Sequence, residues 1–101
     1  MSAYVIVSYN IVNREGFKDY VPGVMPLLSK HGAEVLAADF NAQSLEGDKK
    51  SVYVILKFKS EEAALNWYND PDYKDVKKIR MSSCNDNTLV LAKPFEASGA
   101  Q

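Results

Sequence analysis

The hydrophobic pattern of the chain predicts four β-strands, at residues 4–11, 33–40, 51–59 and 88–93. Successive residues of a strand point to opposite faces of the sheet. The third strand therefore gathers four large apolar residues on one face: Val52, Val54, Leu56 and Phe58. In the first strand one face is apolar throughout, and the other changes from apolar at Tyr4 and Ile6 to polar at Ser8 and Asn10. That mixed face could line a pocket.

A helical pattern of apolar residues follows the first strand and ends at Gly32. Its apolar residues recur at spacings near three, four and seven, and the stripe extends to His31: Phe17, Tyr20, Val21, Val24 and Leu28. We expect Asn13 to cap the helix N-terminus and Gly32 to end the helix in the left-handed conformation. Pro22 and Pro26 each lack a backbone N–H, so a kink or break is predicted near residues 20–22, with the helix restarting after it.

The segment 58–73 predicts two further helices in close succession. Ser60 is expected to cap the first of them, whose buried stripe contains Ala63, Ala64, Trp67 and Tyr68. Asp70 and Pro71 are expected to end this helix and begin the next, with Asp70 as the cap and Pro71 at the first helical position. Four residues of the last helix recur at helical spacing and lie on one face: Tyr73, Val76, Ile79 and Arg80. The charged guanidinium of Arg80 therefore lies on the apolar face of this helix.

The order β-α-β-β-α-β predicts an α+β, ferredoxin-like fold, in which a four-stranded antiparallel sheet carries its helices on one face. We expect a turn at residues 85–87, a single domain over residues 1–95 and a disordered polar tail over residues 96–101. The other face of the sheet remains substantially apolar, and large exposed apolar patches are rare on monomers. A symmetric homodimer, in which two sheets pack face to face, is therefore expected.

Two sequence motifs are similar to those of a known family. One is Leu45-Glu46-Gly47-Asp48, and the other runs from Phe58 to Tyr73 as Phe-x-Ser-x-Glu-Ala-Ala-x-x-Trp-Tyr-x-x-Pro-x-Tyr, followed by Arg80. In these motifs the chain resembles the family called domain of unknown function 1330, over residues 4–93. The resemblance implies a dimeric α+β barrel, a superfamily whose members commonly bind small organic molecules. It implies no particular reaction.

Composition and charge exclude several classes of function. A content of 47% hydrophobic and 25% charged residues is typical of a globular domain. The net charge of −1 gives no attraction to nucleic acid or to an anionic membrane, and no apolar run is long enough to span a bilayer. One cysteine, Cys84, excludes an intrachain disulfide and a thiolate metal centre, and together with the lack of a signal-peptide pattern it favours a cytoplasmic protein. No phosphate-binding glycine motif is present, so no cofactor is predicted.

Two residues are candidates for catalysis. Arg80 must find an anion or carbonyl groups, and a bound carboxylate would satisfy it; the alternative is an internal ion pair, with Glu46 or Asp86. His31 is the only histidine and could act as a general acid or base. The alternative for His31 is a structural role at the helix end, because spacing identifies no catalytic partner.

Five residues are candidates for ligand binding: Ser8, Asn10, Tyr20, Glu46 and Tyr73. The two strand residues could form hydrogen bonds inside the barrel, or they could simply be solvated at a strand end. The tyrosines could stack on a planar ligand or donate a proton, although aromatic residues at helical spacing usually belong to the core. Glu46 lies with Asp48 in the polar loop 41–50, where the two could pair as acid and base or bind a cation weakly; the alternative is that the loop is simply solvated. The loop could lie at the barrel mouth or in the dimer interface.

Three functions remain open from the sequence. The first is a cofactor-independent enzyme that acts on a small organic acid or aromatic compound, with Arg80 holding an anion and His31 or a tyrosine moving a proton. The second is a non-catalytic dimer that binds or senses a small molecule. The third is a purely structural or interaction dimer, in which Arg80 forms an internal ion pair.

Overall fold

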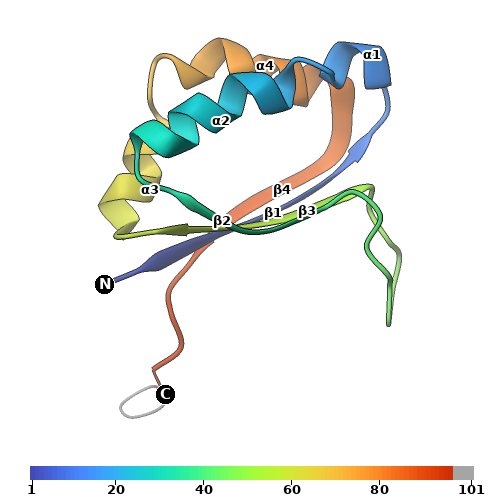
Figure 1. Ribbon diagram of the computed structural model, residues 1–101. Coiled ribbons are helices and arrows are strands. Elements are labelled where there is room, and N and C mark those ends of the chain that lie inside the picture. Colours follow the sequence, from blue (N-terminus) through green and yellow to red (C-terminus); the bar gives the residue numbers. More distant parts are fainter. Residues whose placement is uncertain (97–101) are drawn as a thin grey trace.

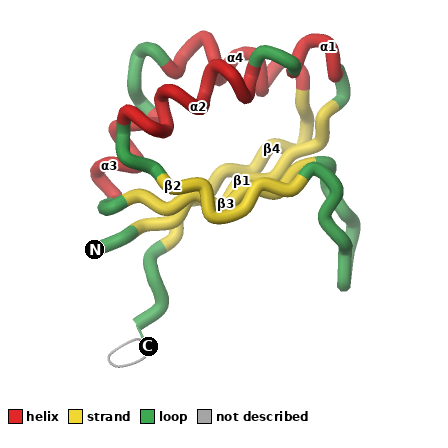
Figure 2. The backbone as a smooth tube through the Cα atoms, viewed as in Figure 1, coloured by secondary structure: helices red, strands yellow, loops and turns green. Residues whose placement is uncertain are grey.

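The computed structural model describes residues 1–96 as one sheet covered by helices. The elements are β1 (Ala3–Ile11), α1 (Arg14–Phe17), α2 (Tyr20–Lys30), β2 (Glu34–Asp39), β3 (Val52–Phe58), α3 (Glu61–Tyr68), α4 (Tyr73–Ser83) and β4 (Cys84–Ala92). The strands lie in the order β2-β3-β1-β4, and every neighbouring pair is antiparallel. All helices lie on one side of the sheet (Figure 1), so the molecule has two layers (Figure 2). This is the ferredoxin-like α+β fold predicted from the element order; of the predicted tail, residues 97–101 lie outside the described residues.

The core lies between the helices and the helix-facing side of the sheet. Residues of β1 alternate between the two faces, so that Val5, Val7 and Tyr9 are buried beneath the helices. The face assignment predicted for the third strand is confirmed, and its apolar residues join a cluster with the large aromatic residues of the helices: Phe17, Tyr20, Trp67 and Tyr73. Burial of these side chains is the main favourable term for folding.

The opposite face of the sheet, here called the outer face, carries an apolar row across all four strands. Val90, Ile6, Ile55 and Ala37 are successive neighbours in the strand register. The three larger side chains are 52%, 43% and 39% exposed, in that order. Loop 41–50 and the segment after β4 extend on the side of the sheet away from the helices (Figure 1). The described residues therefore leave an apolar strip uncovered between two projecting segments.

Predicted helix ends are confirmed where local chemistry determines them. Asn13 and Ser60 each accept, through the side chain, a hydrogen bond from the amide three residues later, at 2.9 and 3.0 Å. Gly32 has a φ of +72°, and the amide of Ala33 reaches back to the carbonyl of Leu28 at 2.9 Å. This is the hydrogen-bonding pattern that a left-handed C-terminal glycine allows.

The predicted break in the first helical segment occurs two residues earlier than expected. α1 ends at Phe17 and α2 begins at Tyr20, so the prediction of a break at residues 20–22 is corrected to 18–19. Pro22 lies in the first turn of α2, where a backbone N–H has no partner within the helix in any case. Pro26 is the proline inside the helix, and it does not interrupt it.

Two predictions about the second half of the chain are corrected. α4 begins at Tyr73 with Asp72 at its N-cap position, so Pro71 is not its first residue, and the Asp72 side chain forms no capping bond. Asp70 caps the turn that leads into α4, because its Oδ1 accepts a hydrogen bond from the Asp72 amide at 2.9 Å. Residues 85–87 do not form a separate turn, because β4 starts at Cys84, directly after α4. These polar residues belong to β4, and the pairing of β4 with β1 shifts in register at this point. Asp86, within the irregular part of the strand, has a φ of +52°.

The junction between α4 and β4 is bonded to the segment after β1. The carbonyl of Ser83, a buried residue, accepts hydrogen bonds from the amides of Val12 at 2.9 Å and Asn13 at 3.0 Å. The start of the last strand and the end of the first strand are thereby held side by side.

Candidate functional site

A cavity of about 100 Å³ lies between α2 and the sheet. Its lining residues are all apolar or aromatic and come mainly from β1, α2, β2 and β3: Val7, Tyr9, Tyr20, Val21, Val24, Met25, Leu28, Val35, Ala38, Phe40, Val54, Leu56, Trp67 and Leu89. The more exposed of them, such as Met25 on α2 and Phe40 after β2, lie on one side. The cavity therefore opens between α2 and the edge strand β2.

A buried polar cluster lies behind the tyrosines of this cavity. The Tyr20 hydroxyl is 2.6 Å from the Tyr73 hydroxyl and accepts a hydrogen bond from Arg80 Nε at 3.3 Å. Arg80 Nη1 donates to Asn87 Oδ1 at 2.8 Å, and the whole Arg80 residue is only 2% exposed. The guanidinium lies 5.8 Å from the ring centres of both Tyr9 and Tyr20. A cation is thus held just outside an apolar chamber, with tyrosine rings between the two.

The electrostatics around Arg80 keep the phenols of Tyr9 and Tyr20 protonated. Burial raises the pKa of Tyr9 and of Tyr20 well above the ordinary value of a tyrosine; Tyr73 adds to the rise at Tyr20, whereas Arg80 opposes it. Burial lowers the pKa of the Arg80 guanidinium, but Tyr20 and Tyr73 raise it by more, so the net shift is upward and the group remains a cation. Near neutral pH Tyr9 and Tyr20 can therefore donate hydrogen bonds but cannot serve as bases.

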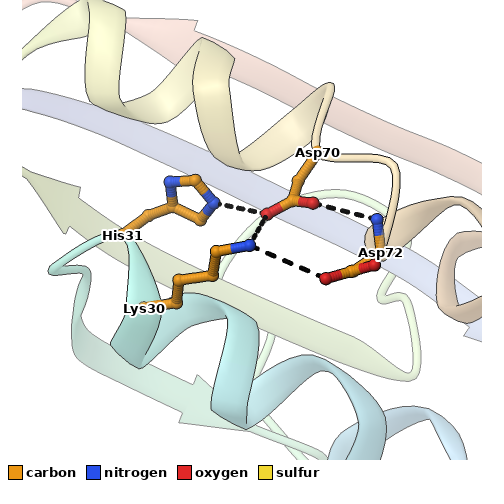
Figure 3. A network of polar contacts seen from close by, with 4 residues as sticks. All are labelled: Lys30, His31, Asp70 and Asp72. Atoms are coloured by element: carbon orange, nitrogen blue, oxygen red, sulfur yellow. Dashed lines mark hydrogen bonds and ion pairs between the residues drawn. The ribbon is translucent and has the colours of Figure 1, made fainter.

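A second polar group, drawn in Figure 3, joins the end of α2 to the turn between α3 and α4. Asp70 Oδ2 lies 2.7 Å from His31 Nε2 and 2.8 Å from Lys30 Nζ, and Asp70 Oδ1 accepts a hydrogen bond from the Asp72 amide at 2.9 Å. The bonds from Lys30 and His31 hold the pKa of Asp70 well below its usual range. α2 forms one wall of the cavity, so this ion pair network ties the C-terminal end of that wall to the turn between α3 and α4.

The structure brings three of the predicted site residues together. Arg80, Tyr20 and Tyr73 form the buried cluster, and of these only Tyr20 lines the cavity. The alternative of an internal ion pair for Arg80 with Glu46 or Asp86 is not found; its hydrogen-bond partners within residues 1–96 are Tyr20 and Asn87. A buried arginine bonded to neutral oxygens is thus the arrangement present.

The other predicted residues lie elsewhere. His31 belongs to the ion pair network and is not among the cavity-lining residues. Ser8 and Asn10 point to the outer face, where Ser8 Oγ is 2.6 Å from Thr88 Oγ1 and Asn10 Nδ2 donates to Asp86 Oδ2 at 3.2 Å. Glu46 is exposed in loop 41–50. These four residues therefore share no site with Arg80 within one protomer.

Sequence reasoning missed three features of the site. Asn87, the partner of Arg80, was assigned to a turn, and no sequence signal pairs these two residues. Asp70 is predicted only as a helix cap, and nothing in the sequence pairs its carboxylate with Lys30 and His31. Trp67 was assigned to the core, which is correct, but its Nε1 atom is buried without a hydrogen-bond partner among the described residues. That donor could not be predicted from periodicity.

Two other kinds of site receive no support from residues 1–96. No group of three or more His, Cys, Asp or Glu side chains is arranged there to hold a metal ion. Burial raises the pKa of the Cys84 thiol, which disfavours the reactive thiolate form.

None of the helices within residues 1–96 is both long and apolar enough to cross a membrane.

Solved structures similar to the chain share its fold. A protein of unknown function from Rhodopseudomonas palustris has a TM-score of 0.81 at 18% identity, with 94% of this chain and 83% of that chain covered. A dimeric ferredoxin-like protein of unknown function from Jannaschia sp. has a TM-score of 0.68 at 16% identity, covering 93% of this chain and all of the other, 100%. SnoaB, a cofactor-independent oxygenase from Streptomyces nogalater, has a TM-score of 0.65 at 10% identity, with 98% of each chain covered. At these identities the likeness shows the fold alone.

No curated protein matches the sequence. A family defined by sequence does match, over residues 2–94, and it is described as a domain of unknown function, DUF1330.

Proposed function

The chain belongs to the domain of unknown function 1330 family, and we propose that it binds a small, uncharged, ring-sized organic molecule in the cavity between α2 and the sheet. The cavity itself is the observation that carries this proposal, because it joins an apolar lining to a polar cluster immediately behind it. Pockets that combine mostly apolar walls with a few polar groups are the usual form of small-molecule sites.

Size and charge narrow the ligand class. An apolar cavity of roughly 150 Å³ can hold benzene, so a cavity of about 100 Å³ that opens to one side suits a single ring. A carboxylate would be costly there, since no charged residue is among the lining side chains and Arg80 lies behind Tyr9 and Tyr20. Of the ligands considered from the sequence, neutral aromatic compounds are therefore favoured over organic acids.

Intrinsic fluorescence offers a direct test, because Trp67 is the one tryptophan of the chain and lines the cavity. Toluene is expected to change the Trp67 emission saturably, whereas benzoate, which adds a charge to the same ring, is not. Ala38→Phe should fill the cavity and abolish the response to toluene, and Met81→Phe, on the exposed side of α4, should leave it intact. Absence of a saturable response to any neutral single-ring compound would rule out the proposed site.

We further propose that the functional unit is a homodimer whose outer faces pack together. The exposed row of Ile6, Ile55 and Val90 supports this, as does the dimeric state of similar ferredoxin-like proteins. Ile6→Lys should place a charge in the interface and yield a monomer in light scattering, while the control Met81→Lys should remain dimeric. A monomeric wild-type protein would contradict the proposal.

Turnover of the bound molecule is a second candidate function. The observation in its favour is the Arg80–Tyr20–Tyr73 cluster, because a protonated phenol backed by a cation can stabilise an oxyanion that develops on a ligand. The fold likeness to SnoaB, a cofactor-independent oxygenase, is compatible with such chemistry. In this proposal a tyrosine, rather than His31, acts on the ligand. Mass analysis of a bound compound after incubation separates the two candidates, since binding alone returns it unchanged.

A cytoplasmic location remains a proposal from the sequence. Its basis is the single cysteine, which lies buried at the start of β4. Fractionation of the native cells would test it.

A further inference from the structure

The mouth of the cavity is bordered by apolar side chains that remain exposed to solvent. Four residues, here called the mouth patch, line the cavity and are 39%, 47%, 38% and 52% exposed, in that order: Val21, Met25, Val35 and Phe40. At the inner end of the cavity the lining residues belong to the core, and Tyr9 and Leu56 are each 3% exposed. A molecule in the cavity is therefore enclosed on one side and meets exposed hydrocarbon on the other.

The surface around the mouth patch carries no charge along most of its length. α2 has no charged residue before Lys30, its last, and β2 has charges only at its two ends, Glu34 and Asp39. Surface helices ordinarily carry charged side chains on the face that water contacts. α2 packs against α4 elsewhere, with Gly23 against Val76, and this contact leaves the mouth patch uncovered. Exposed apolar surface that borders a cavity is typical of a ligand-binding groove.

We infer that the ligand carries an alkyl chain on its ring, and that this chain leaves the cavity through its mouth and lies over the mouth patch. The inference rests on the proposed function and specifies its ligand class as alkyl-substituted aromatic compounds. The cavity accommodates a single ring and its inner end is closed by the core, so a longer molecule can extend only between α2 and β2. An alkyl chain would remove apolar surface of both partners from water, which is favourable in proportion to the area covered.

Toluene and butylbenzene form the test pair, because they share the ring and differ by three CH₂ groups. Full burial of one CH₂ group strengthens binding about fourfold, and a chain with one side in water should gain about twofold for each group. Fluorescence titration of the full chain, monitored through Trp67, is therefore expected to show butylbenzene bound about eightfold more tightly than toluene.

Matched variants separate the mouth patch from other apolar surface. Met25 and Met81 are 47% and 55% exposed, but of the two only Met25 lines the cavity. Met25→Gln should reduce the preference for butylbenzene by about half or more, and Phe40→Ser should do the same, because each replaces apolar contact area with a polar group. Met81→Gln should leave the preference unchanged. The ratio of the two affinities is compared, so that effects on the site of the ring itself cancel.

The outcomes separate the inference from the function on which it rests. If toluene does not bind, the proposed function fails and the inference fails with it. If toluene binds and butylbenzene binds no more tightly, the cavity is a site for a bare ring and the inference is overturned. A preference that is the same in the wild type, Met25→Gln and Phe40→Ser would place the chain elsewhere, with the same consequence. Light scattering tests a different occupant: a lower mass for Met25→Gln than for the wild type would show that a second protein chain covers the mouth patch in place of a ligand.

Discussion

Replacement of Tyr20 by phenylalanine tests the central polar cluster at the level of one oxygen atom. The hydroxyl joins two elements, because it is 2.6 Å from the Tyr73 hydroxyl and accepts from Arg80 Nε at 3.3 Å. Phenylalanine keeps the ring in the core and removes both bonds. Arg80 would then retain its bond to Asn87, at 2.8 Å, and a buried cation would lose one of its two acceptors.

The expected loss of stability follows from these contacts. A neutral buried hydrogen bond contributes about 1 kcal/mol, and one to a charged group about 1.5–3 kcal/mol. The bond to Arg80 is long, which places it at the low end, so Tyr20→Phe should lower the free energy of unfolding by about 2–3 kcal/mol. That is a large share of the roughly 5–15 kcal/mol that stabilises a domain of this size.

Urea denaturation at a fixed protein concentration measures this loss. With a slope of about 1.5 kcal/mol per molar urea, the midpoint should fall by about 1.5 M. Tyr68→Phe is the matched control, because the Tyr68 hydroxyl forms no hydrogen bond within residues 1–96, and it should change stability by less than about 0.5 kcal/mol. If both variants unfold at the same urea concentration, the hydrogen bonds of the Tyr20 hydroxyl do not stabilise the fold.

Two further predictions concern the ends of helices. The lowered pKa of Asp70 means that its bonds stabilise the fold above the unfolded-state pKa of about 4 and are lost as the pH falls through the folded value. Asp70→Asn should therefore flatten the loss of stability in acid, measured by urea midpoints across pH, and a profile parallel to that of the wild type would show that Lys30 and His31 do not stabilise the carboxylate. Ser60→Ala removes the cap of α3 and should cost about 1 kcal/mol in the same assay, whereas Ser82→Ala, near the end of α4, should cost less.

The fold could be predicted from sequence because it depends on patterns within single elements. Alternation in β1 and β3 determines which residues enter the core, and the side chains of Asn13 and Ser60 determine where two helices begin. Gly32 marks a helix end for the same kind of local reason, since its φ of +72° suits glycine above other residues. Such features need no knowledge of distant contacts.

The site could be predicted only in part, because its geometry depends on contacts between distant segments. The sequence identifies Arg80 as a charged residue on an apolar stripe, which predicts that its side chain is buried. The residue is 2% exposed, as this predicts. Its partner Asn87 lies in a strand irregularity that local rules describe as a turn. His31 contacts Asp70, which lies 39 residues away in the sequence. The sequence around Asp70 indicates a helix cap and gives no sign of this contact. Separations of this kind are set by the fold, and the pattern of one element does not encode them.

The carbonyl of Ser83 links the two halves of the chain, and this has a consequence for local unfolding. The amides of Val12 and Asn13 belong to exposed residues after β1, a position where backbone protons ordinarily exchange quickly with solvent. Here both protons are bonded to a buried residue at the junction of the last helix and the last strand. They can exchange only when that junction opens, so the beginning and the end of the domain should form one cooperative unit rather than two separable repeats.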